Sequence, residues 1–211
     1  MRTAARLASG TGATALAIAL LGATAGTAAA APATSDPWYG VNNNSQYWMT
    51  VSDSTPKVGD TITLSTSMKR RVAIETITKV KQVVPTCLSY VAGSAVWNDK
   101  PVDNIEDGSG EDPGYVLAKG SWTVDGTGKV GNNWSAVSTL AMQFTVNPSC
   151  ATGEAMPTTM HITGSLNNRT DQDKGPTITV AKGIGGGIGG GLPDLGGSGS
   201  LDTGSLGSLL P

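Results

Sequence analysis

The sequence is poor in the residues from which catalytic and metal sites are most often built. It contains one histidine, His161, two cysteines and no Gly-x-Ser-x-Gly motif. Nucleophilic hydrolysis needs a base beside the nucleophile and a third group that orients this base. A zinc site needs several histidine or cysteine ligands. The sequence therefore predicts a protein that is not an enzyme and holds no cofactor.

Charged residues are also scarce, at 14% of the chain, and the formal net charge is −2. A mildly acidic chain is a poor candidate for binding nucleic acid or an anionic membrane surface. The one basic cluster, Lys69-Arg70-Arg71, lies beside a predicted turn. We interpret it as part of a solvated loop rather than as a binding patch.

No apolar run near the N-terminus is long enough to span a bilayer. Residues 13–23 form an apolar core that follows Arg2 and Arg6, and Ala28-Ala29-Ala30 supplies the small residues of a cleavage site. These features predict a bacterial, Sec-type signal peptide over residues 1–30, with a membrane anchor as the alternative. The mature protein is then secreted or associated with the cell envelope, and it has no transmembrane span.

The C-terminal residues 183–211 are rich in glycine and serine, with scattered leucines. Glycine loses the most conformational freedom on folding, so this composition predicts a disordered, flexible tail. The tail is either a plain tether or an apolar segment that docks on a partner. Between the two ends we expect a linker over residues 31–45 and one domain over residues 46–182.

Alternation of apolar and polar residues dominates this domain. Leu140, Met142, Phe144 and Val146 alternate with polar or small residues, as expected for a strand with one buried face. Similar short segments recur between turn motifs, and no helical period is sustained. The strand segments expected from this pattern are 47–51, 61–65, 76–84, 88–91, 95–97, 101–102, 115–117, 121–124, 139–146, 158–163 and 177–180. This spacing predicts an all-β fold, an antiparallel β-sandwich.

The two cysteines are expected to form a disulfide. An even cysteine count in an exported protein favours a bridge. Cys87 follows Pro85 at the start of one predicted strand, and Cys150 follows Pro148 after the end of another. A metal site or a catalytic thiol is the alternative, but it lacks histidine and further cysteine partners.

Two motifs resemble the DUF11 family of bacterial surface repeats. They are Val58-Gly59-Asp60-Thr61-Ile62-Thr63-Leu64 and the segment 84–94, which reads VPTCLSYVAGS. Cys87 stands where the family usually has glycine, and Gln82 where aspartate is usual. The resemblance covers residues 50–166 and implies an Ig-like sandwich on an exported protein.

Two groups of residues are candidate binding sites. Five tryptophans stand against one phenylalanine, and Trp97, Trp122 and Trp134 are candidates for an exposed row that stacks on sugars, with a role in the core as the alternative. Carboxylates also gather in one loop where they could bind calcium weakly, or lie solvated. They are Asp103, Glu106, Asp107, Glu111 and Asp112.

The expected function is that of a structural or adhesive module at the cell surface. A carbohydrate- or wall-binding module that uses the three tryptophans is the second hypothesis. The expected partners are envelope polysaccharide or another surface protein.

Overall fold

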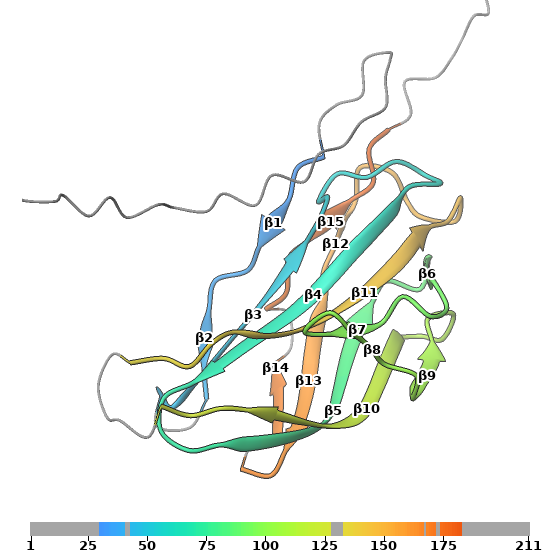
Figure 1. Cartoon of the computed structure of the whole chain (residues 1–211). Coiled ribbons are helices and arrows are strands. Elements are labelled where there is room, and N and C mark those ends of the chain that lie inside the picture. Colours follow the sequence, from blue (N-terminus) through green and yellow to red (C-terminus); the bar gives the residue numbers. More distant parts are fainter. Residues whose placement is uncertain (1–29, 41–42, 128–132, 167, 172–173, 183–211) are drawn as a thin grey trace, which may run out of the picture.

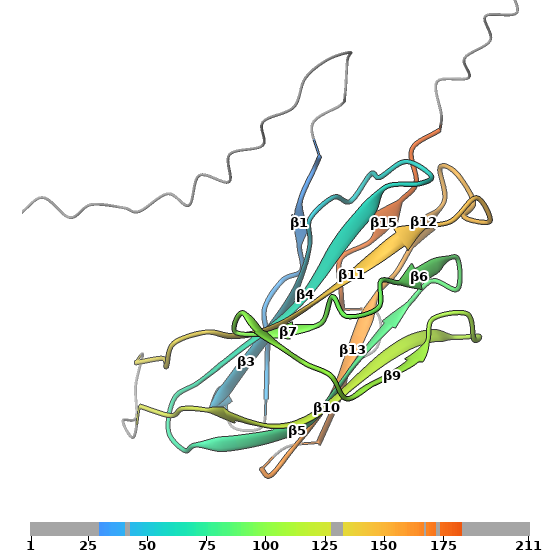
Figure 2. The same ribbon diagram turned by 45° about the vertical axis from the view of Figure 1, so that its right-hand side comes forward.

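The structure is a computed structural model of the whole chain, and it describes residues 30–40, 43–127, 133–166, 168–171 and 174–182. The predicted tail, and the predicted signal peptide apart from residue 30, lie outside the described residues. The described part forms fifteen strands, and every pair of these strands is antiparallel. Two sheets face each other and enclose the core (Figures 1 and 2).

The larger sheet contains eight strands in the order β1-β3-β4-β11-β7-β8, with β2 paired to β3 and β6 paired to β11. Its strands are β1 (Ala33–Thr34), β2 (Trp38–Tyr39), β3 (Ser45–Val51), β4 (Thr61–Arg70), β6 (Leu88–Tyr90), β7 (Val96–Trp97), β8 (Lys100–Pro101) and β11 (Ser138–Val146). The long strands β3, β4 and β11 form its centre.

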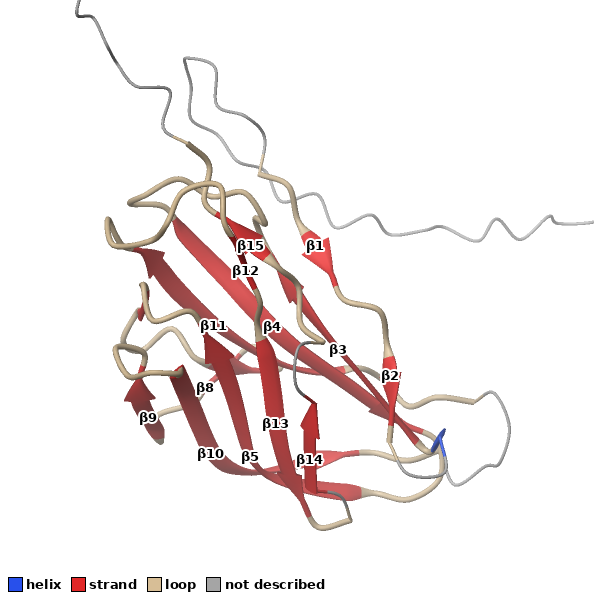
Figure 3. Ribbon diagram, turned by 180° about the vertical axis from the view of Figure 1, so that it is seen from behind, coloured by secondary structure: helices blue, strands red, loops and turns tan. Residues whose placement is uncertain are grey.

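The smaller sheet contains five strands in the order β14-β13-β5-β10-β9, which Figure 3 shows from the opposite side. Its strands are β5 (Glu75–Val84), β9 (Ile105–Gly108), β10 (Gly114–Val124), β13 (Thr159–Gly164) and β14 (Asn168–Asp171). A separate pair, β12 (Ala155–Met156) and β15 (Ile178–Thr179), lies at one end of the sandwich.

The predicted alternation explains how the core forms. On β11 the four apolar residues named above are completely buried, and their polar neighbours face outward. The same phase recurs on β3, β4 and β5. Full burial of one large apolar side chain contributes about 1.5–3 kcal/mol. The predicted Ig-like antiparallel β-sandwich is confirmed.

Strands β7 and β8 form a β-hairpin. Trp97 pairs with Lys100, and the two residues between them, Asn98 and Asp99, have φ values of 47° and 65°. A two-residue loop with positive φ at both positions matches the right-handed twist of a hairpin. Asparagine and aspartate tolerate this conformation better than most residues.

The N-terminal segment differs from the predicted linker. Within residues 31–45, strands β1 and β2 pair with β3, and β3 itself begins at Ser45. Strands of two residues carry no recognisable period, so the sequence pattern does not reveal them. Their pairing satisfies backbone groups along the β3 edge that would otherwise be open.

Strand β10 joins two segments that were predicted as separate strands, 115–117 and 121–124. Its register against β5 shifts between Lys119 and Trp122, and Gly120 lies within this bulge. A Cβ atom at Gly120 would collide with the Trp122 ring, so this position requires glycine. The bulge re-aims Trp122 without ending the strand.

Both ends of the described chain lie at one end of the sandwich. Ser54 donates its backbone N–H to the carbonyl of Ala31 (2.7 Å), and it accepts the N–H of Thr179 (2.8 Å). Figure 1 shows β1, β12 and β15 together at this end. We call it the proximal end, and the opposite end, where β4 turns into β5, the distal end.

Candidate functional site

An aromatic and basic cluster lies on the outer face of the larger sheet, toward the distal end. Tyr39 on β2 is followed across the sheet by Gln46 on β3 and Lys69 on β4, because the register pairs Tyr39 with Gln46 and Gln46 with Lys69. Trp48 lies on the same face of β3, two residues beyond Gln46. We call Tyr39, Trp48, Lys69, Arg71 and Trp134 the Trp134 cluster.

Trp134 is the centre of this cluster. Its ring lies 6.4 Å from that of Tyr39, and the Arg71 guanidinium carbon lies 4.2 Å from its centroid. Lys69 Nζ lies between two rings, 5.1 Å from the Trp134 centroid and 5.6 Å from that of Trp48. These distances fall within the range of cation–π attraction.

The backbone holds these side chains in place. The segment before β11 runs beside the end of β4, where Ser135 donates its N–H to the Arg70 carbonyl (2.8 Å) and its hydroxyl accepts the Arg70 N–H (3.0 Å). Gln46 also donates to the Tyr39 hydroxyl (3.3 Å). Tyr39 remains 43% exposed, and the other four side chains are partly exposed.

The cluster carries positive charge without a carboxylate counterpart. The ion pairs found among the described residues are Arg70 with Glu75 and Lys119 with Glu106, and neither involves Lys69 or Arg71. Arg71 Nε is buried and has no hydrogen-bond partner in the described part of the chain. The site therefore offers flat aromatic surfaces and two cations that are not neutralised.

Two of the three predicted tryptophans have a different role. Trp97 on β7 is 6% exposed, and its ring stacks on that of Trp122 on β10, with centroids 4.8 Å apart and an interplanar angle of 12°. The stack connects the two sheets from within. Trp97, Trp122 and Trp134 do not form a common exposed row, because the first two pack against each other and only Trp134 belongs to the surface cluster.

The predicted acidic loop is partly a strand. Glu106 lies on β9, where its carboxylate accepts hydrogen bonds from Lys119 Nζ (2.6 Å) and from the Tyr115 hydroxyl (2.8 Å). Asp107 accepts the N–H of Ser109 (2.9 Å). Among the described residues, no three or more His, Cys, Asp or Glu side chains gather closely enough to hold a metal ion. Asp103, Glu106, Asp107, Glu111 and Asp112 are therefore not brought together as calcium ligands.

The contacts of Glu106 shift two ionisation equilibria. The hydrogen bond from Lys119, then that from Tyr115, and then the charge of Lys119 lower the pKa of Glu106 below its ordinary value. The hydrogen bond to Glu106 raises the pKa of Tyr115, with smaller contributions from burial and from the Glu106 and Glu111 charges. Both groups belong to a surface network that links β9 and β10.

The interpretation of Lys69-Arg70-Arg71 as a solvated loop is wrong for Arg70. Arg70 ends β4 and is 5% exposed; its guanidinium pairs with Glu75, which is 1% exposed at the start of β5. Arg70 also donates to the Ser45 hydroxyl (2.5 Å) and the Ala73 carbonyl (2.8 Å). This buried ion pair closes the distal end of the core.

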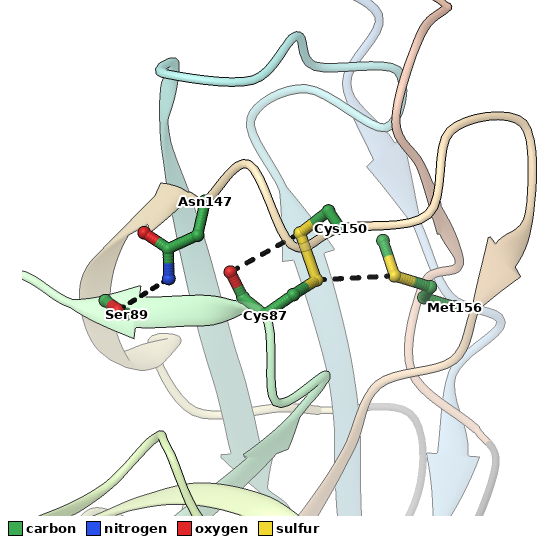
Figure 4. The surroundings of a disulfide bond; sticks show 5 residues. All are labelled: Cys87, Ser89, Asn147, Cys150 and Met156. Carbon is green, nitrogen blue, oxygen red and sulfur yellow. Dashed lines mark hydrogen bonds between the residues drawn. A yellow bond between two sulfur atoms is a disulfide. The ribbon is translucent and has the colours of Figure 1, made fainter.

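The predicted disulfide between Cys87 and Cys150 is present, with the two Cα atoms 5.0 Å apart (Figure 4). It joins the start of β6 to the loop after β11, near the proximal end. Met156 Sδ lies 3.7 Å from Cys87 Sγ, and the Cys87 carbonyl oxygen lies 3.4 Å from Cys150 Sγ. We describe these as close contacts, because oxidised sulfurs carry no hydrogen to donate. Asn147 donates to the Ser89 hydroxyl (2.7 Å) and braces the same corner.

A groove of about 490 Å³ lies beside the disulfide, between Val84, Asp112 and Met156. A glycosidase requires two carboxyl groups that flank the scissile bond. Asp112 is the only carboxylate among the described residues that line this groove. The groove therefore does not have the paired carboxylates of that chemistry.

Sequence reasoning missed Tyr39, Trp48, Lys69 and Arg71 as members of a surface site. One signal was available, because the alternation within residues 47–51 places Trp48 opposite the buried face. The cluster itself depends on how β2, β3 and β4 pair, which the sequence pattern does not give. His161 is partly exposed between the buried residues Met160 and Ile162, so its side chain does not face the core.

No protein-family model and no curated protein matches the chain, so the DUF11 resemblance stays a prediction. Solved structures with a similar arrangement include a protein described as membrane-anchored from Corynebacterium diphtheriae (13% identity, TM-score 0.47, 69% of this chain and 38% of that one). Others are the RrgB pilus protein of Streptococcus pneumoniae (13%, 0.36, 54% and 20%) and BcpA, the major pilin subunit of Bacillus cereus (10%, 0.35, 64% and 41%). The chain thus spans less than half the length of each of these proteins, and the similarity identifies no shared function.

The described residues contain no helix of the length and apolarity needed to cross a membrane.

Proposed function

We propose that this chain is a non-catalytic structural module that is exported and displayed at the cell surface. The observation that carries the proposal is that the core is held together at both ends, by a disulfide at one and by a buried ion pair at the other. The Cys87–Cys150 bridge lies near the proximal end, and the buried Arg70–Glu75 pair closes the distal end. A disulfide persists in an oxidising compartment and is rare in the cytosol, which supports a location outside the cell.

The positions of the chain ends support display. Ala31 and Thr179 both contact Ser54 at the proximal end, so the chain enters and leaves the sandwich there. The Trp134 cluster lies toward the distal end. A domain held through its proximal end presents this cluster away from its attachment, as an adhesive module requires.

The proposal is tested by treating intact cells that express the full chain with trypsin. Peptides from the sandwich are expected in the medium while a cytosolic marker stays intact. The matched control is a chain that begins with a start methionine before Ala31 and lacks residues 2–30; it is expected to resist digestion in intact cells. Equal protection of both chains would contradict surface display.

A further inference from the structure

The Trp134 cluster combines aromatic rings and positive charge on one surface. Three aromatic rings, those of Tyr39, Trp48 and Trp134, stand on one face. Two cations, Lys69 and Arg71, lie among them and lack an acidic partner in the described residues. We propose that this cluster is a binding surface for an acidic polysaccharide.

The aromatic rings account for recognition of the sugar units. A pyranose ring presents C–H groups on its faces, and an aromatic ring carries a negative face that attracts such weakly positive hydrogens. Lys69 Nζ lies 5.6 Å from the Trp48 centroid and 5.1 Å from the Trp134 centroid, so both indole rings are close to this cation. The parts of the Tyr39, Trp48 and Trp134 rings that remain exposed are the surfaces on which sugar units would stack.

The two cations account for the acidic character of the ligand. Hydrogen bonds between a cationic donor and a carboxylate or phosphate are about twice as strong as neutral ones. Arg71, whose guanidinium carbon lies 4.2 Å from the Trp134 centroid, adds a second positive charge to the same surface. Lys69 provides a point charge between the two indole rings.

The charge of the whole chain argues against nucleic acid as the occupant. Duplex DNA carries one negative charge per about 1.7 Å, and proteins that bind it carry a strong basic surface. Here the formal net charge is −2, and the cluster has two cations. A polymer with at most one negative charge per sugar matches that sparse positive charge better.

Affinity electrophoresis or calorimetry with the purified full chain tests the proposal, using polygalacturonate and a phosphomannan as probes. The first presents carboxylates and the second phosphates, so the two arms separate the kinds of acidic group. Binding is expected to at least one of them and to weaken as salt is raised. Fully methyl-esterified polygalacturonate has the same backbone without the charge, and it is expected to bind at least about tenfold more weakly.

Substitutions locate the surface. Trp134→Ala and Lys69→Met are each expected to weaken binding about tenfold. Lys81→Met is the matched control, because Lys81 Nζ also lies over an aromatic ring, that of Tyr115, at 3.7 Å on the other sheet. It is expected to leave binding unchanged. Thermal unfolding of each variant shows that the domain remains folded.

The proposal is overturned if neither acidic polymer binds, or if the esterified polymer binds equally well. It is also overturned if Trp134→Ala and Lys69→Met bind as the unsubstituted chain does. Tighter binding of single-stranded DNA or poly-glutamate than of both polysaccharides would assign the cluster to another class of ligand. The inference goes beyond surface display, and since these measurements use purified protein, their outcome is independent of where the chain resides.

Discussion

At the residue scale, the tryptophans divide by what their rings contact rather than by their spacing in the sequence. Trp97 and Trp122 stack on each other between the sheets, whereas Trp134 meets Arg71 and Lys69 at the surface. The first pair packs inside the fold, and the ring of Trp134 is partly exposed at the surface. Composition predicts that some tryptophans fill a core, but it does not say which.

This division predicts unequal effects on stability. Trp97→Ala removes a buried ring and leaves a cavity beside Trp122, so the free energy of unfolding should fall by about 3–5 kcal/mol. Trp134→Ala removes a partly exposed ring and should cost less than about 1 kcal/mol. Urea denaturation followed by circular dichroism measures both. Equal losses for the two variants would contradict the assignment.

The Glu106 network predicts a pH effect of defined sign. The folded protein holds the pKa of Glu106 below its ordinary value, so this group contributes stability above its unfolded-state pKa, which is lost as pH falls through the folded pKa. Tyr115 has a raised pKa, so its contribution is present below its unfolded-state pKa and is lost as pH rises through the folded value.

Lys119 is the main cause of the lowered pKa of Glu106, so its removal should reverse this shift. Lys119→Met is expected to raise the pKa of Glu106 toward its ordinary value, as measured by NMR titration of the side-chain carboxyl carbon. Lys57→Met, which removes the same charge in the exposed loop before β4, is the control, because Lys57 is not among the groups that shift the pKa of Glu106. A Glu106 pKa unchanged by Lys119→Met would refute the network.

At the element scale, the sequence pattern predicted all the long strands and some short ones, but it missed β1, β2, β9, β12 and β14. Strands β4, β5 and β11 have 9 or 10 residues each and show a clear alternation. Strands β1, β2 and β12 have two residues each, too few to show a period. The Trp134 cluster was not predicted because it depends on the register of β2 and β4 against β3, which the sequence pattern does not give. Cys87 and Cys150 were paired correctly, because two cysteines allow one intramolecular bridge.

The bridge between β6 and the loop after β11 should be a major source of stability. It joins residues 63 apart, for which the chain-entropy model gives about 4 kcal/mol. Replacement of both cysteines by serine should lower the free energy of unfolding by about that amount in urea. As a control, the free energy of unfolding of the unsubstituted chain is measured with and without reductant. A loss below about 1 kcal/mol would contradict a structural role for the bridge.

The buried ion pair between Arg70 on β4 and Glu75 on β5 leads to a second prediction about stability. Arg70→Met leaves Glu75 as a buried charge without its cation, so the free energy of unfolding should fall by about 3–5 kcal/mol. The double variant Arg70→Met, Glu75→Leu removes both charges and should recover most of this loss. If the double variant is as unstable as Arg70→Met alone, the unpaired charge of Glu75 is not the cause of the lost stability.

At the scale of the whole molecule, the fold places the ends of the described chain and the Trp134 cluster toward opposite ends of the sandwich. The two ends of the described chain meet at Ser54 beside the proximal end, and the Trp134 cluster lies toward the distal end. The Cys87–Cys150 bridge lies near the chain ends, and the partly exposed aromatic cluster lies away from them; this arrangement is compatible with the proposed structural module.

The central claim, that the sandwich is an exported and oxidised domain, is tested most directly by non-reducing peptide mapping. Protein released by trypsin from intact cells is digested without reductant and analysed by mass spectrometry. The account predicts a peptide pair linked through Cys87 and Cys150, which separates after reduction. Protein found only inside the cells, with both thiols free, would contradict it.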